Sequence, residues 1–570
     1  MTATMTYWVA GLLLAAMLGR RAYLRLQLSL AKHGSLAGHA RMSRFVAGLV
    51  PYYAYDDAQF FRADGAPDAI EAQRRAAFQR LATLFARRYP TTISRSREAR
   101  TGIADLQFTS RYRVPFQFSA RVREQLDAGV FARSSQGATI TDLDGNRHYD
   151  LTGSYGVNVF GNDFYKECIE AGGALVRDLG PVLGTLHPVI ADNVQRLREI
   201  SGLDQVSFHM SGTEAVMQAV RLARYHTRRR YLVRFCGAYH GWWGEVQPGV
   251  GNPLPVHDTL TLRDMDERSL RVLRSRSDIA CVLVNPLQAL HPNGSAPSDS
   301  TLVDSARRAG FDRAAYTRWL QRLRQVCSER GIVLIFDEVF LGFRLARGGA
   351  QEYFGVRADM VTYGKTVAGG LPIGVVCGRG DLMQRFNEAR PADVCFARGT
   401  FNSHPYVMGA MHEFLRRLDS APLQACYRDL DQRWDDRAAT LNERLRAAGV
   451  NVQVAPLSTV WTVWYPQPSR YNWMFQYYLR AHDLALSWVG TGRLIFTLDF
   501  PEADFNAVVE RFVSAARQMQ QDGWWWQDAQ LTNKSIKRRV LLEMIHARLH
   551  HASDQSAHPA ADTEALGNKA

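Results

Sequence analysis

The chain has 570 residues, of which 46% are hydrophobic and 22% are charged. This balance is typical of a folded protein and excludes a mainly disordered chain, a collagen-like chain and a multi-span membrane protein. The net charge of +14 points to nucleic acid or an anionic membrane as a partner. The seven cysteines include no C-x-x-C pair and no zinc-ligand spacing, which predicts free, mostly buried thiols in a reducing compartment.

The N-terminus carries an uncharged apolar segment, residues 7–19, followed directly by Arg20 and Arg21. As a helix it is about 20 Å long, against roughly 30 Å for the hydrocarbon core of a bilayer. A cleaved signal peptide is disfavoured because the positive charges follow the apolar run. A buried globular helix is one alternative. We expect an uncleaved membrane-anchor helix, either transmembrane or in the interface, with the protein body at the cytoplasmic face of the inner membrane.

Most of the excess positive charge lies in residues 1–134, which contain 20 Arg and Lys against 9 Asp and Glu. Within them, the stretch 74–88 is typical of a helix with arginines around one apolar face, made by Phe78, Leu81, Leu84 and Phe85. Two interpretations stay open for this face. It either contacts an anionic membrane as a second attachment or packs on the protein's own body.

From about residue 135 onward, short apolar runs alternate with amphipathic helical patterns. An Asp-Gly pair within 139–150 predicts a β-hairpin. The expected strands are Gln205–His209, Tyr231–Phe235, Cys281–Val284, Val333–Phe336, Met360–Tyr363 and Gly374–Cys377, and the expected helices include Glu214–Tyr225 and Tyr316–Arg330. This order predicts an α/β fold with a largely parallel sheet covered on both faces. Its ligand is expected beyond the carboxyl ends of the strands.

Two segments that follow expected strands suit a flat, phosphorylated ligand. The segment 210–215 (M-S-G-T-E-A) opens a helix, whose N-terminus offers N–H groups and a positive dipole to a phosphate. An ordinary helix cap has the same pattern. The segment 237–241 (G-A-Y-H-G) places an aromatic ring between glycines, where it can stack on a flat ring. Aromatic residues are, however, also common in loops.

Two further segments carry charge at the ends of apolar strands. Asp337 and Glu338 need a partner if buried, either a cationic ring nitrogen or an ordinary cap or salt bridge. Lys365 lies among small and apolar neighbours, and desolvation makes a lysine a nucleophilic amine for Schiff-base chemistry. Together the four segments predict a pyridoxal phosphate site, which needs a lysine, a carboxylate for the ring nitrogen and a phosphate cradle.

Residues from about 138 to about 526 resemble the class III pyridoxal-phosphate aminotransferases. Within that family they are most similar to the glutamate-1-semialdehyde aminomutase subgroup and to aminotransferases of polyketide and natural-product pathways. The matching motifs are D-L-D-G-N-R-H-Y-D (142–150), S-G-T-E-A (211–215), Y-H-G (239–241), D-E-V-F-L-G-F-R (337–344), G-K-T-V-A-G-G-L-P-I-G (364–374) and R-G-T-F-N-S-H-P (398–405). The resemblance implies fold type I, with a large domain built on a mostly parallel seven-stranded sheet and a small α+β domain.

The resemblance also implies roles for three catalytic residues. Lys365 forms the Schiff base with pyridoxal 5'-phosphate and moves the proton. Asp337 pairs with the ring nitrogen, and Tyr239 packs on one face of the ring opposite Val339.

Further site residues follow from the same resemblance. Gly212 and Thr213 bind the phosphate, and His240 is a further cofactor-binding residue. Thr400 reaches the phosphate of the neighbouring subunit of a homodimer, and Tyr155 lies at the substrate entrance. No metal site is expected.

Three departures from the family pattern leave the cofactor chemistry intact and the substrate open. The chain has Asn285-Pro286 where the family usually has Glu-Pro, and the following loop, 287–293, lacks the usual glycine pattern. Arg493 stands near the C-terminal strand, where small-molecule ω-aminotransferases often carry a switching arginine, but its register is open.

We expect six segments along the chain. They are an N-terminal membrane anchor (1–34), a basic, largely helical lead region (35–134), the N-terminal part of the small domain (135–180), a large cofactor-binding domain (181–420), the C-terminal small domain (421–527), and a basic helix with a disordered tail (528–570).

The expected function is transfer of an amino group from an amino-acid donor to an aldehyde or ketone in a biosynthetic pathway. The anchor favours a hydrophobic or carrier-tethered acceptor. The alternative is an aminomutase that moves an amino group within one substrate. A non-enzymatic scaffold or nucleic-acid binder is disfavoured because the motif residues form a complete set and no helix-turn-helix, zinc-finger or RNP-type pattern occurs.

Overall fold

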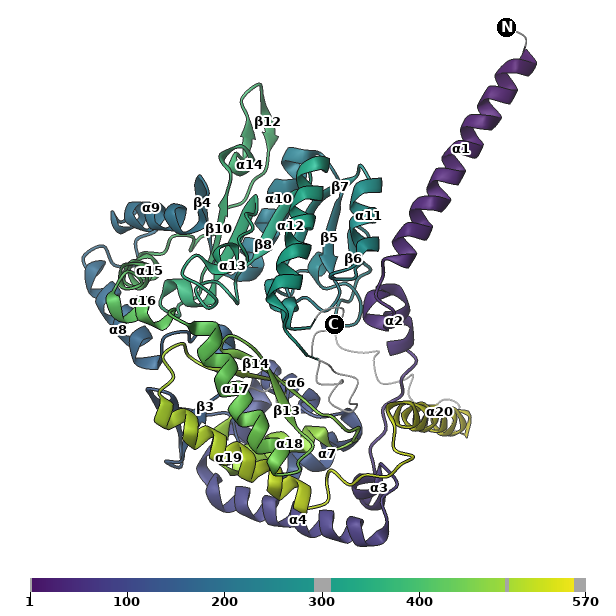
Figure 1. The fold of residues 1–570 in the computed structure, drawn as a ribbon, viewed down its shortest axis with the longest axis vertical. Coiled ribbons are helices and arrows are strands. Elements are labelled where there is room, and N and C mark those ends of the chain that lie inside the picture. The colour runs from purple at the N-terminus through teal and green to yellow at the C-terminus, as the bar shows by residue number, and fades with distance from the viewer. Residues whose placement is uncertain (1–2, 292–308, 487–491, 558–570) are drawn as a thin grey trace, which may run out of the picture.

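The computed structural model describes residues 3–291, 309–486 and 492–557 (Figure 1). A seven-stranded sheet with the order β4-β10-β9-β8-β7-β5-β6 forms its centre. The strands are β4 (Gln205–His209), β5 (Tyr231–Phe235), β6 (Thr259–Leu262), β7 (Ile279–Val284), β8 (Val333–Asp337), β9 (Met360–Gly364) and β10 (Gly374–Gly378). Neighbours from β9 to β6 are parallel, and β10 is antiparallel to both β4 and β9. The mostly parallel sheet predicted from the sequence is confirmed.

Helices cover this sheet on both faces, which explains why its central strands are buried along their whole length. The expected helices at 214–225 and 316–330 lie within α10 and α12. The helices of this part are α8 (Asn162–Leu175), α9 (Val189–Ser201), α10 (Gly212–Thr227), α11 (Glu267–Ser275), α12 (Arg313–Arg330), α13 (Gly349–Phe354), α14 (Gly380–Met383) and α15 (Pro405–Arg417). A short hairpin, β11 (Phe386–Asn387) and β12 (Arg390–Val394), projects from it.

Two smaller sheets flank the central one. The first has the order β1 (Ala132–Gln136), β2 (Thr139–Asp142), β3 (Arg147–Asp150) and β15 (Leu484–Ala485), and the second joins β13 (Gln453–Leu457), β14 (Val460–Trp464) and β16 (Arg493–Ile495). The helices beside them are α16 (Ala421–Cys426), α17 (Leu430–Ala447), α18 (Phe475–Ala481) and α19 (Glu502–Gln521). β2 and β3 form the predicted hairpin, and β3 pairs in parallel with the distant β15. The predicted domain boundaries stay a prediction.

The lead region is helical, and its longest helix runs beneath the small sheets in the view of Figure 1. It contains α2 (Ala40–Ala47), α3 (Asp57–Arg62), α4 (Asp68–Arg88), α5 (Pro90–Gly102), α6 (Ala104–Tyr112) and α7 (Phe116–Gln125). In α4, Phe78, Leu81 and Phe85 are buried, and the Phe78 ring packs edge-on against Phe60 and Phe61. The apolar face of 74–88 therefore packs on the protein's own body, and its alternative interpretation as a membrane contact is wrong.

The first helix, α1 (Ala3–Leu30), extends away from the body and meets α11 only near its own end (Figure 1). In the part of the chain that the structure describes, no helix combines the length and the apolar character needed to cross a membrane. The expected transmembrane anchor is therefore not supported. The physical reason is that the uncharged run stops at Arg20 and Arg21, well before α1 ends.

The C-terminal segment returns to the body. Trp524 and Trp525 are fully buried, and α20 (Asn533–Ala557) follows them. Glu543 of α20 accepts hydrogen bonds from the buried Arg470 (2.6 Å) and from Tyr55 (2.5 Å). The predicted disordered tail beyond residue 557 lies outside the described residues. All seven cysteines are free thiols and six are buried, as predicted.

Candidate active site

The functional side chains predicted from the sequence meet at one edge of the central sheet. Lys365 directly follows β9, Asp337 ends β8, and Tyr239 follows β5 after a short loop. Because β9, β8, β7 and β5 are parallel neighbours, their carboxyl ends lie side by side. The structure thus brings together residues that are up to 126 positions apart in the sequence.

Asp337 is held by three donors. His240 Nδ1 lies 2.7 Å from Asp337 Oδ2, and the Val339 N–H and Thr362 hydroxyl donate to Oδ1 at 3.2 and 3.3 Å. Burial lowers the pKa of His240, against the opposing effect of Asp337, so the ring is neutral and its Nδ1–H donates to the carboxylate. His240 Nε2 is buried and has no partner among the described residues. His240 therefore orients Asp337 and leaves a buried polar atom beside the site.

Lys365 is nearly buried and sits in a left-handed backbone conformation, with φ of 51°. Burial lowers the pKa of its amine, and the negative charge of Asp337 partly opposes this. Its Nζ makes no hydrogen bond or ion pair with any described residue and lies 5.5 Å from the centre of the Phe340 ring. A desolvated amine without a partner is the state in which lysine is most nucleophilic.

The loop before α10 is closely packed around its glycine. Ser211 caps the helix by accepting from the Glu214 N–H, so the N–H groups of the first turn have no partner within the helix. A Cβ at Gly212 would come within 2.6 Å of Val339 Cγ1, and one at Gly241 would overlap the Thr213 hydroxyl. Only glycine permits this approach of the helix N-terminus to Val339.

The structure places three of the expected residues at the surface. Thr400 is exposed on the loop before α15, and the contact expected of it with a neighbouring subunit stays a prediction. Tyr155 is 50% exposed, also has a positive φ, and lines a cavity beside the small sheets. Tyr239 is 63% exposed, and its backbone carbonyl accepts from Asn285 Nδ2 at 3.0 Å.

Three residues gain a place in the site that sequence reasoning did not assign. Asn285 follows β7, between Asp337 and Tyr239 along the sheet edge, and it fastens the Tyr239 loop. Phe340 lies between Lys365 and Arg493, whose guanidinium carbon is 5.9 Å from the ring centre. Burial lowers the pKa of Arg493 to about 10, and its Nε has no partner among the described residues. From the sequence, Asn285 was a departure from the family pattern, and Arg493 had an open register because that register depends on the pairing of β14 with β16. Phe340 was marked only by the motif that contains it.

Known proteins are similar to this chain in both sequence and fold. The family model for class-III aminotransferases matches residues 120–246 and 267–513. A glutamate-1-semialdehyde 2,1-aminomutase of Geotalea daltonii is 31% identical over 393 residues, which cover 65% of this chain and 85% of that protein. The enzyme of the same name from Alkaliphilus oremlandii is 35% identical over 309 residues, covering 51% of this chain and 67% of that protein.

Two solved structures are similar over most of their own length. A transaminase with PLP bound has a TM-score of 0.58 and 27% identity, and the match covers 69% of this chain and 92% of that one. A glutamate-1-semialdehyde-aminomutase from Pseudomonas aeruginosa PAO1 has the same fold, with a TM-score of 0.59 and 18% identity over 79% of this chain and 99% of that one.

Proposed function

The chain belongs to the class-III aminotransferases, and from this premise we propose that it moves an amino group from an amino-acid donor to a hydrophobic or carrier-tethered aldehyde or ketone in a biosynthetic pathway. It is a pyridoxal-phosphate enzyme. The observation that carries the proposal is the meeting of an unpaired, buried Lys365 with a triply held Asp337 at the carboxyl edge of the sheet.

The residues at this edge fit pyridoxal phosphate. Val339, which is expected to pack on the ring, is fixed by close contact with Gly212 and Gly364, since a Cβ at either glycine would come within 3.1 Å of it. The first turn of α10 suits the phosphate, because the N–H groups of Gly212 and Thr213 have no partner within the helix and the helix dipole attracts anions. Asp337 suits a protonated ring nitrogen, since the one side chain of the described residues within ion-pair distance of its carboxylate is the neutral His240 ring.

When bound, pyridoxal phosphate supplies an aldehyde for the substrate amine and an electron-withdrawing ring that stabilises negative charge on the neighbouring carbon. Asp337 would hold the proton on the ring nitrogen, and His240 orients the Asp337 carboxylate by donating a hydrogen bond to it. Lys365, with its lowered pKa, would accept a proton at Nζ from the substrate carbon and deliver it to another substrate atom. Arg493 faces Phe340, forms no ion pair with a described residue, and is placed to pair with a substrate carboxylate.

We also propose that the protein associates with the cytoplasmic face of the inner membrane through α1 lying in the interface. Support comes from apolar side chains that are exposed along this helix and from the arginines that follow them, because such helices bind anionic lipid surfaces. The exposed residues are Tyr7, Trp8, Leu12, Leu13, Leu14, Met17 and Leu18. Sedimentation with anionic vesicles tests this. We expect the full chain to bind and a variant lacking residues 3–30 to stay in the supernatant with its activity intact, and equal sedimentation of the two would contradict the proposal.

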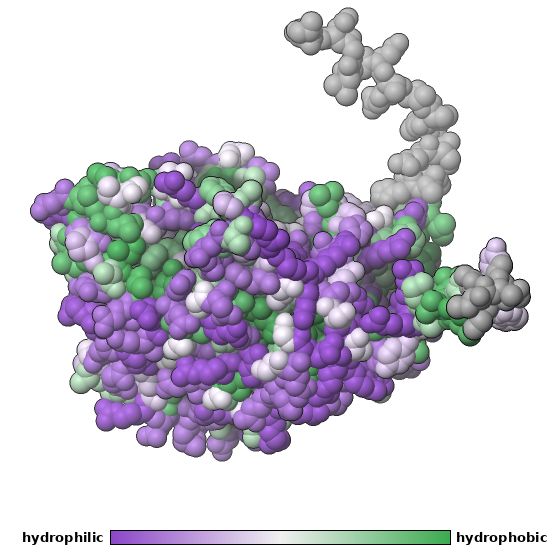
Figure 2. Space-filling view, turned by 90° about the horizontal axis from the view of Figure 1, so that it is seen from above, coloured by the Kyte–Doolittle hydropathy of each residue, from purple (hydrophilic) through white to green (hydrophobic). Residues whose placement is uncertain are grey.

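We propose a homodimer that shares its active sites. Figure 2 shows hydrophobic residues gathered at the end of the molecule where Figure 1 places α8 and α15. Exposed apolar side chains of this part are Ile169, Leu175, Val182, Leu186 and Tyr406. Patches of this kind mark protein interfaces. Analytical ultracentrifugation is expected to give a dimer, and Leu186→Glu a monomer with little activity.

The test of transamination uses the purified holoenzyme with glutamate or alanine and a long-chain aldehyde. We expect the visible absorbance of the cofactor to change on addition of the donor, and the amine product to form on addition of the aldehyde. A broad donor panel that produces no change would refute the proposal.

An aminomutase remains the second candidate, because the relatives named above carry that activity in their names. The two are separated by whether a free oxo-acid accumulates from the donor, which only transamination produces.

A further inference from the structure

A cavity of about 410 Å³ lies between the lead region and the small sheets, and its size is within the range of small-molecule sites. One wall comes from α6, α7 and the segment 126–132, and the other from β2, β3, α18 and residues 152–155. None of the motif residues expected to hold the cofactor lines it. The cavity exists only because the lead region folds against the catalytic body.

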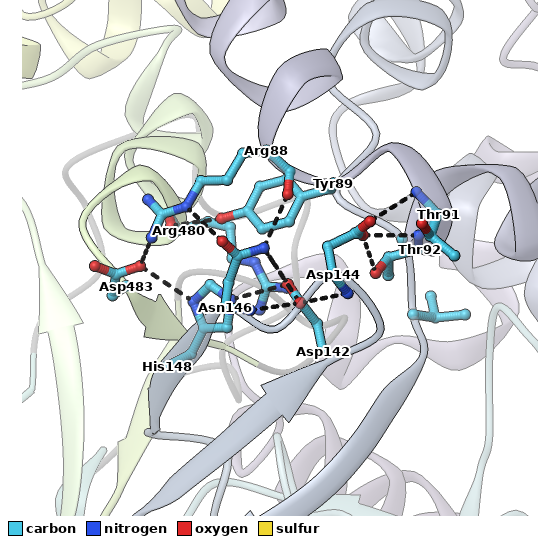
Figure 3. A network of polar contacts seen from close by, with 12 residues as sticks. Arg88, Tyr89, Thr91, Thr92, Asp142, Asp144, Asn146, His148, Arg480 and Asp483 are labelled. Atoms are coloured by element: carbon cyan, nitrogen blue, oxygen red, sulfur yellow. Dashed lines mark hydrogen bonds and ion pairs between the residues drawn. The ribbon is translucent and has the colours of Figure 1, made fainter.

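A polar network fixes the lead region in this place (Figure 3). The turn between β2 and β3 supplies Asp144, whose carboxylate accepts from the N–H groups of Thr91 and Thr92 at the start of α5, both at 2.9 Å. The neighbouring Asn146 donates to the backbone carbonyl of Arg88 at 2.9 Å. The Arg88 side chain forms an ion pair with Asp483. These hydrogen bonds and this ion pair therefore hold together two parts of the chain that are distant in sequence and that form the walls of the cavity.

Two arginines of the lining, Arg113 and Arg480, have carboxylate partners that are absent or distant among the described residues. Arg113 donates to the side-chain oxygen of Gln476 at 2.8 Å and forms no ion pair with a described residue. Arg480 is 18% exposed, its nearest carboxylate oxygen is 3.9 Å away on Asp142, and its buried Nε has no partner. That carboxylate is already occupied by the backbone and side chain of Asn146 and by the His148 ring. Arg113 is close enough for its charge to lower the pKa of Arg480, after the larger effect of burial.

The remaining charges of the lining do not cancel this pair. Arg100 is paired with Asp127 at 2.9 Å, and Asp105 and Arg123 are exposed at the rim. His148 is neutral, because burial, and next the charge of Arg480, lower its pKa to about 3. An anionic group in the cavity could pair with Arg113, which forms no ion pair with a described residue, and with Arg480, whose carboxylate partner Asp142 is 3.9 Å away.

The lining also includes many apolar side chains, and through Tyr155 it adjoins residues that pack near the lysine. Aliphatic and aromatic side chains line it from both walls: Leu106, Val114, Val122, Leu126, Val130, Phe131, Ile140, Tyr477, Ala485 and Leu486. At one end Tyr155 lines the cavity, and the next residue, Gly156, lies so close to Phe340 that a Cβ would come within 2.6 Å of that ring. Phe340 is also the ring beside Lys365.

We propose that this cavity is a substrate subsite that binds an elongated aliphatic molecule by an anionic terminus, a carboxylate or a phosphate, held by Arg480 and Arg113. The aliphatic body lies along the apolar lining, and the reacting end passes Tyr155 toward Lys365. The subsite deepens the proposed function and rests on it, since it names the chemistry at the far end of the acceptor. The lead region is then a specificity element of the enzyme.

Calorimetric titration of the holoenzyme with octanoate, octyl phosphate and octanol tests the subsite without turnover. We expect one or both anions to bind at least roughly tenfold more tightly than octanol, as suits a charge-assisted hydrogen bond in a partly buried site. Arg480→Gln removes that advantage, whereas Arg318→Gln, on the exposed side of α12, keeps it. The tighter of the two anions identifies the terminus. Equal binding of octanol and both anions, or an advantage that survives Arg480→Gln, overturns the proposal.

A second pair of variants covers the case in which Arg480→Gln does not fold. Val130 lines the cavity and is 52% exposed, so polar side chains are tolerated there. Val130→Glu is expected to weaken binding of the anions roughly tenfold by repulsion, while the isosteric Val130→Gln leaves it unchanged. Equal effects of the two variants contradict the subsite.

These experiments distinguish a failure of the proposed subsite from a failure of the proposed transamination. If the cofactor absorbance responds to amino donors but the octyl anions bind no better than octanol, only the subsite fails. If the anions bind as expected but no donor changes the absorbance, only the proposed transamination fails.

Discussion

His240→Phe is the substitution that most sharply probes how the site holds its carboxylate. The wild-type ring donates to Asp337 Oδ2 over 2.7 Å, and both side chains are buried. Phenylalanine fills a similar space but has no donor, so Asp337 loses one of its three hydrogen bonds. A hydrogen bond to a charged group contributes about 1.5–3 kcal/mol. At 1.36 kcal/mol for each factor of ten, kcat/KM is expected to fall roughly 10- to 150-fold.

The absorbance of the bound cofactor separates positioning from a merely structural role, because Asp337 is proposed to pair with the ring nitrogen and loses a donor in His240→Phe. The absorbance maximum of the His240→Phe holoenzyme is expected to shift from its wild-type position. His240→Asn, which keeps an N–H donor, is expected to recover part of the rate and to return the absorbance toward its wild-type position. The reasoning is refuted if the two variants lose the same activity, or if the absorbance of His240→Phe is unchanged.

Three more predictions follow from single contacts. Gly212→Ala pushes a Cβ against Val339, so we expect the affinity for the cofactor to drop about tenfold in an equilibrium titration. A second substitution, Val339→Ala, should restore part of that affinity. An unchanged affinity in Gly212→Ala would contradict the close packing of Gly212 on Val339. Glu543→Gln leaves Arg470 without its charge partner, and α20 should exchange its amide hydrogens faster while stability to urea falls by about 1–3 kcal/mol. Lys365→Met should stabilise the cofactor-free protein at neutral pH. Because burial lowers the pKa of this lysine in the folded protein, the unfolded chain binds more protons than the folded chain below pH 10.5. The stability gained by Lys365→Met should therefore shrink as the pH rises toward 10.5, as measured by unfolding titrations at several pH values.

The catalytic body was predictable from the sequence because its signals are local. Runs such as 279–284 are apolar at every position, which indicates a strand buried on both faces. The motif residues end or follow such runs: Asp337 ends β8, Lys365 directly follows β9, and Tyr239 follows β5 after a short loop. The strand order found in the structure then places Lys365 and Asp337 side by side.

The lead region was not predictable in the same way, since its position depends on contacts across hundreds of residues. The apolar face with Phe78 and Phe85 has the same pattern whether it meets lipid or protein, and only the folded chain decides between them. Asp144 belongs to a motif turn, yet its contacts with Thr91 and Thr92 carry no sequence signal. The cavity formed by this docking is therefore visible only in the structure.

The central claim is that Lys365 is the lysine that carries pyridoxal phosphate. Borohydride reduction of the holoenzyme, followed by peptide mass spectrometry, tests it most directly, because reduction fixes the cofactor to its lysine. The account predicts the added cofactor mass on the peptide containing Lys365 and its loss in Lys365→Ala. Attachment at another lysine, or no attachment in a protein that still transfers amino groups, would contradict it.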